Sequence, residues 1–157
     1  MIDLGAKNIR KAKIGDAFRL AEIELFNYRL NFYPIFKSDD YFFNELSVPV
    51  LMGEYEADEA MIARSFVYDD GVVKGFIRVR GAHIEKLFVE PVLQRGGIGE
   101  ALLAFAVKKL GANELLVLEK NKKAIRFYER NGFCLTDQKQ PVDDTAEYLI
   151  LMRRKVK

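Results

Sequence analysis

The chain has 157 residues, of which 50% are hydrophobic and 31% are charged, a balance typical of a globular protein with one sizeable core. Its 25 basic and 23 acidic side chains leave a formal net charge of +2, without the basic excess typical of nucleic-acid-binding proteins. One cysteine and one histidine exclude an internal disulfide and a structural zinc site. We therefore expect a single domain over residues 1–157, with no metal ion and no nucleic-acid partner.

The two ends of the chain and its hydropathy bear on location. Met1–Gly5 lacks the cationic region and the apolar run of a signal peptide, and no apolar stretch approaches the roughly 18 residues of a membrane span. The basic stretch at the other end is more simply a solvated terminus than a binding site; its residues are Arg153, Arg154, Lys155 and Lys157. We expect a cytoplasmic protein without a membrane partner.

The first part of the chain is predicted to form a strand, a helix and an irregular aromatic segment. Residues 8–14 have the pattern of a short strand. Asp16 is a suitable N-cap for a helix, and apolar residues follow at helical spacing: Phe18, Ala21, Ile23, Leu25 and Phe26. From Tyr28 to Tyr55, prolines interrupt an aromatic-rich sequence, which predicts loops around a short helix near Tyr41–Leu46.

A hairpin and a further strand are expected next. Met61–Tyr68 and Val72–Val79 have strand-like patterns, and Asp69-Asp70-Gly71 between them favours a tight hairpin turn. His83–Val89 follows as another strand and ends before Pro91.

The last third of the chain alternates strands with helices. Ile98–Leu110 is a strongly apolar helix that Gly111 ends as a C-terminal cap. Leu115–Glu119 is an apolar strand, and Asn121–Arg130 is a helix. Two final strands are predicted near Phe133–Asp137 and Tyr148–Met152. Antiparallel hairpins followed by a strand–helix–strand–helix unit indicate the α+β class.

Glycines gather where the strand His83–Val89 passes into the helix that begins at Ile98. The segment Gln94–Gly99 contains Arg95 and three glycines, Gly96, Gly97 and Gly99. Glycine lets the backbone approach a ligand closely, and the unpaired first amides of a helix attract anions. A pyrophosphate fits such a site, whereas the spacing matches neither the dinucleotide fingerprint nor a Walker A loop. The alternative is a glycine-rich turn without a ligand, with Arg95 pointing to solvent.

The second informative segment is Asn121–Phe133. Asn121 lies where the N-cap of a helix belongs, and Tyr128 follows two helical turns later, so both can face the same side. Phe127 and Phe133 have the character of core residues. On spacing alone, Tyr128 is more simply explained as a packing residue.

Together the two segments resemble the GNAT superfamily of N-acetyltransferases. The family's Q/R-x-x-G-x-G/A turn is matched by Gln94, Gly97 and Gly99. Its downstream pattern, N-x-x-A-x-x-F-Y-x-x-x-G-F, is matched by Asn121, Ala124, Phe127, Tyr128, Gly132 and Phe133. The resemblance is firm over His83–Phe133 and extends in element order from Ile9 to Met152. It is loose over Tyr28–Tyr55, where the family builds its acceptor sites.

The resemblance implies a single-domain GNAT-like fold of the α+β class. Such a fold has a mixed, mostly antiparallel sheet of about six to seven strands, flanked by about four helices. Two central parallel strands, here Leu87–Val89 and Leu115–Glu119, splay apart. Their unpaired backbone groups are satisfied by the amide-containing pantetheine arm of acetyl-CoA, which acts like an inserted strand.

The resemblance also implies how residues act on acetyl-CoA, the expected cosubstrate. Backbone groups of Phe88 and Val89 contact the pantetheine, as does Asn121, and amides from Arg95 to Gly99 contact the pyrophosphate. Tyr128 protonates the departing CoA thiolate, since a tyrosine with an ordinary pKa of about 10 is protonated at neutral pH. The implied cofactor-binding residues are Leu87, Phe88, Val89, Gln94, Arg95, Gly96, Gly97, Ile98, Gly99, Asn121 and Tyr128.

A catalytic base is needed because only a neutral amine attacks a thioester. Strand alternation places His83, Glu85, Leu87 and Val89 on one face, so His83 and Glu85 are the candidate bases. His83 lies where many family members carry a glutamate base, and an ordinary histidine pKa of about 6.5 suits proton transfer near pH 7. Glu85, acting directly or through water, is the alternative. A third interpretation makes His83 a strand-end residue satisfied by local hydrogen bonds.

The expected acceptor is a primary amine of a small molecule or of a peptide or protein, at its N-terminus or at a lysine, which attacks directly in a ternary complex. Aromatic residues are candidates for an acceptor pocket: Tyr28, Phe32, Tyr33, Phe36, Tyr41, Phe42 and Phe43. Asp39, Asp40 and Glu45 are candidates for attracting a cationic amine. The alternative is ordinary hydrophobic packing beneath a solvated acidic surface.

Two other classes of protein fit parts of the pattern. A non-catalytic acyl-CoA-binding regulatory module would keep the Gln94–Gly99 site but would not need Tyr128 and a strand base. A nucleotide-binding α/β protein would use the glycine turn for another phosphate ligand. Tyr128 together with a candidate base favours an enzyme, and a homodimer is compatible with the sequence.

Overall fold

The computed structural model describes residues 6–155, so the expectations on Met1–Gly5 and on Lys157 lie outside the described part. Within it, seven strands form one mixed sheet in the order β1-β2-β3-β4-β5-β7-β6. Neighbouring strands are antiparallel except β4 and β5, which are parallel. The strands are β1 (Ile9–Lys11), β2 (Ser65–Asp69), β3 (Val73–Arg80), β4 (His83–Val89), β5 (Glu114–Leu118), β6 (Phe133–Pro141) and β7 (Tyr148–Arg154). This confirms the predicted α+β fold with a mixed, mostly antiparallel sheet.

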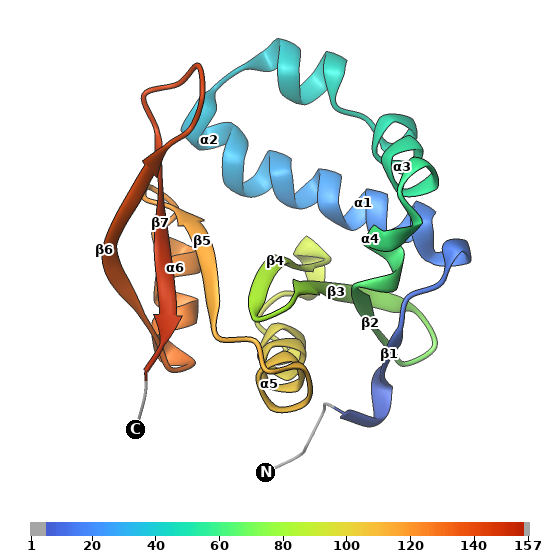
Figure 1. Cartoon of the computed structure of the whole chain (residues 1–157). Helices are drawn as coiled ribbons and strands as arrows, with labels where there is room; N and C mark the ends of the chain where they lie inside the picture. The colour runs from blue at the N-terminus through green and yellow to red at the C-terminus, as the bar shows by residue number, and fades with distance from the viewer. Residues whose placement is uncertain (1–5, 156–157) are drawn as a thin grey trace.

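Helices cover both faces of the sheet (Figure 1). Helices α1, α3 and α4 lie over one face of β2, β3 and β4, and α2 packs at the far end of α1, whereas α5 and α6 pack on the opposite face of the sheet. The helices are α1 (Ala17–Asn27), α2 (Tyr33–Phe36), α3 (Val48–Ala57), α4 (Glu59–Ala63), α5 (Ile98–Leu110) and α6 (Lys122–Arg130). No helix in residues 6–155 is long and apolar enough to cross a membrane.

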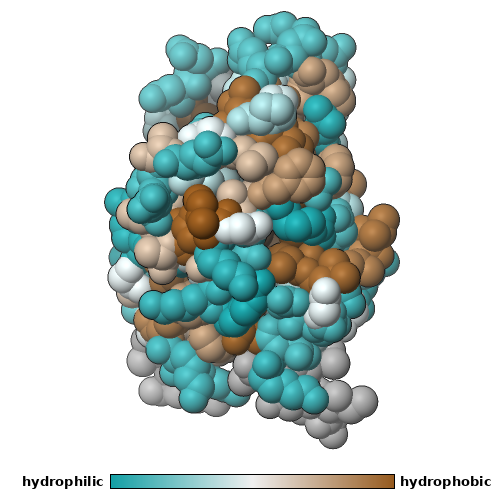
Figure 2. Space-filling model, turned by 90° about the vertical axis from the view of Figure 1, so that its right-hand side faces the viewer, coloured by the Kyte–Doolittle hydropathy of each residue, from teal (hydrophilic) through white to brown (hydrophobic). Residues whose placement is uncertain are grey.

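Separate hydrophobic cores join the helices to the two faces of the sheet. The core on the α5–α6 side contains Leu102, Leu115 and Met152, and the core on the α1 side contains Leu20 and Phe76. These five side chains are at most 2% exposed. On the face of the molecule shown in Figure 2, hydrophobic residues occur in small groups separated by hydrophilic ones.

Local sequence signals set several element boundaries. Strand β4 and helix α5 begin and end at the predicted residues, and Gly111 ends α5 with a left-handed φ of 73°. Asp16 precedes α1 as predicted, but its side chain does not cap that helix. Its Oδ2 instead accepts a hydrogen bond from the N–H of Lys13 at 2.9 Å and contacts Arg10 at 2.9 Å.

The segment from Tyr28 to Tyr55 is mostly helical, so the loops predicted there are wrong. A π-helical segment over Tyr28–Phe32 continues α1, and another spans Asp40–Glu45, close to the predicted short helix. Pro49 begins α3 rather than breaking it, because the first turn of a helix does not need the missing N–H. The start of the strand predicted over Met61–Tyr68 is likewise helical and forms part of α4.

The aromatic residues of this segment pack against one another, and two of them, Tyr41 and Phe43, remain 47% and 53% exposed. Phe42 is 3% exposed and lies in a buried cluster with residues of α1 and α3. Tyr33 packs edge-on against Phe42 and Phe43, with ring centroids 5.8 Å and 5.4 Å away. Tyr28 and Phe32 stack on each other at 5.3 Å. The rings thus contact one another, and their role as the lining of an acceptor pocket stays a prediction.

A buried polar network fixes α1 against the sheet. Glu24 of α1 and Arg78 of β3 are each 4% exposed. The carboxylate of Glu24 accepts hydrogen bonds from the hydroxyls of Tyr28, at 2.5 Å, and Tyr55 of α3, at 2.6 Å. Arg78 donates to the Tyr55 hydroxyl and, at 3.1 Å, to Ser65 of β2. The network therefore joins α1, α3, β2 and β3.

Lys86 of β4 extends the same network. Its Nζ donates to the Tyr28 hydroxyl at 2.8 Å and lies 5.0 Å from the centre of the Tyr28 ring. Burial lowers the pKa of Lys86, and burial together with the Glu24 carboxylate raises the pKa of Tyr28. Glu24 is thus the acid that balances Arg78 and Lys86 within this network.

We predict that Glu24→Gln lowers the free energy of unfolding by about 3–5 kcal/mol, because it leaves buried cations without their counter-charge. Urea denaturation followed by circular dichroism measures the loss. The matched control is Glu22→Gln on the same helix, whose ion pair with Arg19 lies nearer the surface and should contribute less than about 1 kcal/mol. If both variants lost the same small amount of unfolding free energy, the buried network would not be important for stability.

Candidate active site

The parallel strands β4 and β5 separate early. Within the described residues they pair at His83↔Glu114 and Ile84↔Leu115 and nowhere further along, although β4 continues to Val89 and β5 to Leu118. The predicted splaying of two central parallel strands is therefore confirmed (Figure 1).

A β-bulge at Glu85 changes which side chains share a face of β4. The register passes from Arg78↔Lys86 directly to Val79↔Ile84, so Glu85 is an extra residue opposite β3. As a result Ile84 and Leu87 pack into the same core despite their odd spacing. The prediction that His83, Glu85, Leu87 and Val89 share one face is wrong, because the bulge interrupts the alternation.

The two candidate bases have different partners. His83 Nδ1 lies 2.9 Å from Oε2 of Glu114, directly across on β5. Glu85 contacts Arg64 at 3.1 Å and Arg80 at 3.4 Å. Two arginines therefore contact the Glu85 carboxylate, whereas the Glu114 carboxylate orients the imidazole of His83.

Hydrogen-bond alternation decides which residues of β4 direct their backbone groups into the gap. The N–H of Glu90 donates to the carbonyl of Lys74 on β3 at 2.9 Å. Because antiparallel pairs alternate, Phe88, two residues away and opposite Phe76, also turns its N–H and C=O toward β3. Leu87 and Val89 turn theirs toward the gap. The predicted backbone contact of Phe88 with a cofactor is therefore corrected in favour of Leu87 and Val89.

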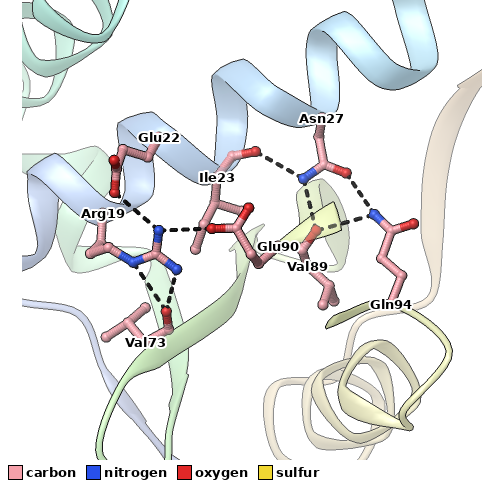
Figure 3. Close-up of polar contacts among 8 residues, drawn as sticks. All are labelled: Arg19, Glu22, Ile23, Asn27, Val73, Val89, Glu90 and Gln94. Atoms are coloured by element: carbon pink, nitrogen blue, oxygen red, sulfur yellow. Dashed lines mark hydrogen bonds and ion pairs between the residues drawn. The ribbon is translucent and has the colours of Figure 1, made fainter. Parts of the chain in front are cut away.

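The carbonyl of Val89 is taken up by two side-chain amides (Figure 3). Asn27 of α1 donates to it at 2.9 Å, and Gln94 donates to it at 3.1 Å. Gln94 also donates to Oδ1 of Asn27 at 3.1 Å and accepts from Lys123 of α6 at 2.8 Å. The Gln94 side chain thus ties the glycine turn to β4, α1 and α6.

A second set of hydrogen bonds and ion pairs, made by Arg19, joins α1 to the same end of the sheet. Arg19 donates to the carbonyl of Val73 at 2.7 Å and 3.2 Å, and contacts Glu90 at 3.0 Å (Figure 3). The sequence analysis did not identify Arg19 or Asn27. Asn27 is 1% exposed. In the sequence it is a polar residue at the end of an apolar helical pattern, and a polar residue at such a position is the signal that could have identified it.

The glycine turn has the backbone of an anion-binding loop. Arg95 and Gly97 take left-handed φ angles of 71° and 91°, and Gly97 is the N-cap of α5. The first helical hydrogen bond runs from the N–H of Ala101 to the carbonyl of Gly97. The three amides of residues 98–100 precede that bond, so the helix does not use them. These amides can bind an anion, and the pyrophosphate site stays a prediction.

Gly99 is required for packing. A Cβ atom at Gly99 would lie 3.3–3.4 Å from the ring of Phe127 on α6. The absence of a side chain therefore allows α5 and α6 to approach each other beside the glycine turn.

Helix α6 carries the other two motif residues. Oδ1 of Asn121 accepts from the N–H of Ala124 at 3.3 Å, which confirms the predicted N-cap and leaves its Nδ2 donor for another partner. Tyr128 is 8% exposed and packs edge-on between Phe127 and Phe133. Burial raises the pKa of Tyr128 above its ordinary value, so its hydroxyl keeps its proton at neutral pH.

A hollow of about 340 Å³ lies on the face of β5 and β7 opposite α5 and α6. Leu116 and Leu151 line it, whereas their neighbours Leu115 and Met152 belong to the α5–α6 core. The other lining residues are His83, Glu114, Gln138, Lys139, Gln140 and Arg153. Parallel pairing of β4 with β5 brings Glu114 beside His83, and the sequence analysis did not predict this contact.

Comparison with known proteins agrees with the fold and the motifs. The acetyltransferase (GNAT) domain pattern matches residues 62–134. The chain is 33% identical over 92 residues to the peptidyl-lysine N-acetyltransferase YiaC of Escherichia coli K12, covering 57% of this chain and 60% of YiaC. It is 29% identical over 106 residues to the peptidyl-lysine N-acetyltransferase YjaB of the same strain, covering 62% and 71%. The match thus spans about three fifths of YiaC.

A solved structure gives the same fold over nearly the whole chain. The PaiA N-acetyltransferase of Thermoplasma acidophilum, in complex with coenzyme A, has a TM-score of 0.66 at 22% identity. The superposition covers 94% of this chain and 98% of that one.

We predict that Gly97→Ala weakens acetyl-CoA binding about tenfold, because a left-handed residue with a Cβ costs about 1–2 kcal/mol and 1.4 kcal/mol is tenfold. Titration calorimetry measures the affinity. Gly96→Ala is the control: its added Cβ would make an ordinary 3.5 Å contact with the Leu93 carbonyl. Equal affinities of the two folded variants would exclude Gly97 as a determinant of the anion site.

Proposed function

Because this chain belongs to the GNAT family of acetyltransferases, we propose that it transfers the acetyl group of acetyl-CoA to the side-chain amine of a peptidyl lysine. The observation that carries the proposal is the gap between β4 and β5, which ends beside a glycine turn and a helix N-terminus. The peptidyl-lysine acceptor is supported by the similarity to YiaC and YjaB, which are peptidyl-lysine N-acetyltransferases. Mass spectrometry of lysine peptides incubated with the protein and acetyl-CoA tests it directly.

The residues around the gap fit the parts of acetyl-CoA. Backbone groups of Leu87 and Val89 suit the amides of the pantetheine arm, and the Nδ2 of Asn121 is a further donor for it. The unpaired amides at the start of α5 suit the pyrophosphate, because the positive end of the helix dipole adds to their hydrogen bonds. Acetyl-CoA supplies the activated acetyl thioester.

His83 is the base we propose for the incoming ammonium. The α5–α6 side of the gap is filled by hydrophobic core that includes Val89 and Leu115, so an amine approaches from the opposite face, where His83 lines the hollow. With Nδ1 facing the Glu114 carboxylate, Nε2 is the ring nitrogen that accepts the proton. The neutral amine then attacks the thioester directly in a ternary complex.

Tyr128 is the acid we propose for the leaving group. Its raised pKa keeps the phenol protonated, so it gives a proton to the CoA thiolate as the carbon–sulfur bond breaks. A non-catalytic acyl-CoA-binding module would have no use for this phenol or for the oriented His83–Glu114 pair.

Tyr128→Phe should lower kcat by about 10²–10⁴-fold, the usual contribution of general acid catalysis, with acetyl-CoA affinity nearly unchanged. Stopped-flow turnover and calorimetry measure the two quantities on one preparation. Wild-type turnover by the folded variant would show that Tyr128 only packs in the core.

His83→Gln should remove most of kcat/KM, together with the decline in rate toward acidic pH that occurs when a catalytic base becomes protonated. Rates measured from pH 6 to 9 with one peptide give the profile. Glu85→Gln on the same strand is the control. It should keep both the wild-type rate and the decline in rate at low pH, because the Glu85 carboxylate is engaged in ion pairs with two arginines. A larger loss in Glu85→Gln than in His83→Gln would identify Glu85 as the base.

A further inference from the structure

Three residues with charged or titratable side chains form a row across the hollow. His83 of β4 lies opposite Glu114 of β5, and Glu114 lies opposite Arg153 of β7. All three side chains line the hollow. Neighbouring strands are about 4.8 Å apart, so His83 and Arg153 are separated by two strand spacings, or about 10 Å.

Arg153 is the cation in this row that makes no ion pair within 4 Å in the described residues, although the Glu114 carboxylate lies on the neighbouring strand. Glu114 is engaged by His83 at 2.9 Å. Lys139, the other lysine or arginine lining the hollow, pairs with Glu119 at 2.5 Å. In the part of the chain that the structure describes, Arg153 has no ion pair and no side-chain hydrogen bond. The sequence analysis assigned Arg153 to a solvated basic terminus. The residue is indeed exposed, and the β5–β7 pairing places it at the hollow, beside the proposed base.

An arginine whose guanidinium makes no ion pair can affect which lysines are acceptors. The ammonium of an incoming lysine is repelled by a nearby cation, and a carboxylate on the same peptide replaces that repulsion by attraction. The planar guanidinium also matches a carboxylate with two parallel hydrogen bonds. A spacing of about 10 Å corresponds to about three residues of extended chain.

We propose that Arg153 selects acceptor lysines that have an aspartate or glutamate within two or three residues. The inference rests on the proposed acetyl transfer to peptidyl lysine and adds a sequence preference to it. Arg153 contacts the peptide away from the reacting atoms, so it acts on the choice of acceptor, and its loss should raise KM more than it lowers kcat.

The test compares two peptides that differ only in an aspartate or an asparagine two residues from one lysine. Wild type should show a kcat/KM about threefold to fivefold higher for the aspartate peptide, the size of a solvent-exposed ion pair. Arg153→Glu should reverse the preference, Arg153→Gln should abolish it, and salt should weaken it. Arg154→Glu on the same strand, with the same change in net charge, should keep the wild-type preference.

Binding without turnover separates this inference from the proposed function. Fluorescence anisotropy measures the affinity of both peptides, with norleucine in place of lysine, in the presence of CoA. Equal binding of the two peptides to wild type, or the same preference in wild type and Arg153→Glu, would overturn the role of Arg153. Preferential binding that reverses in Arg153→Glu supports it even if the lysine peptides are not acetylated, a result that would count against the proposed transfer alone.

Discussion

The early separation of β4 from β5 is the constraint on which the rest of the structure depends. Parallel strands normally satisfy each other's backbone groups along their length, but Leu87 and Val89 turn theirs into a gap. A strand that loses one neighbour needs support from elsewhere. Strand β3 continues to pair with β4 as far as Val89, and Asn27 and Gln94 take up the Val89 carbonyl. Support of this kind keeps the gap open beside the glycine turn.

This support explains why α1 carries polar residues at buried positions. Asn27 joins α1 to the end of β4, and Glu24, one turn earlier, joins it to Arg78 through Tyr55. Burying such groups is costly unless their hydrogen bonds are made, and no buried polar side-chain atom within residues 6–155 lacks a partner. Helix α1 is thereby fixed over β3 and β4 (Figure 1). The hollow lies on the β5–β7 side of the same face.

The hollow brings together residues that serve different proposed steps. Strand β4 provides His83, β5 provides the carboxylate that orients it, and β7 provides Arg153 at the far side. The proposed acid, Tyr128, comes from α6 and belongs to the core on the opposite face. Placing the acid and the base on opposite faces of the gap suits a reaction in which the amine enters from one side and the thiolate leaves toward the other.

Features that depend on near neighbours could be predicted from the sequence: the hairpin turn, the caps of α5 and α6, the glycine turn, and the succession of the seven strands with α1, α5 and α6. Their hydrogen bonds join residues a few positions apart, so a short window of sequence contains the whole signal. The tertiary structure alone decided the bulge at Glu85, the loss of Phe88 as a backbone contact, and the partners of His83 and Val89. His83 and Glu114 are 31 residues apart in sequence, and Asn27 and Val89 are 62 apart. Such contacts depend on strand order and register, which no local pattern specifies.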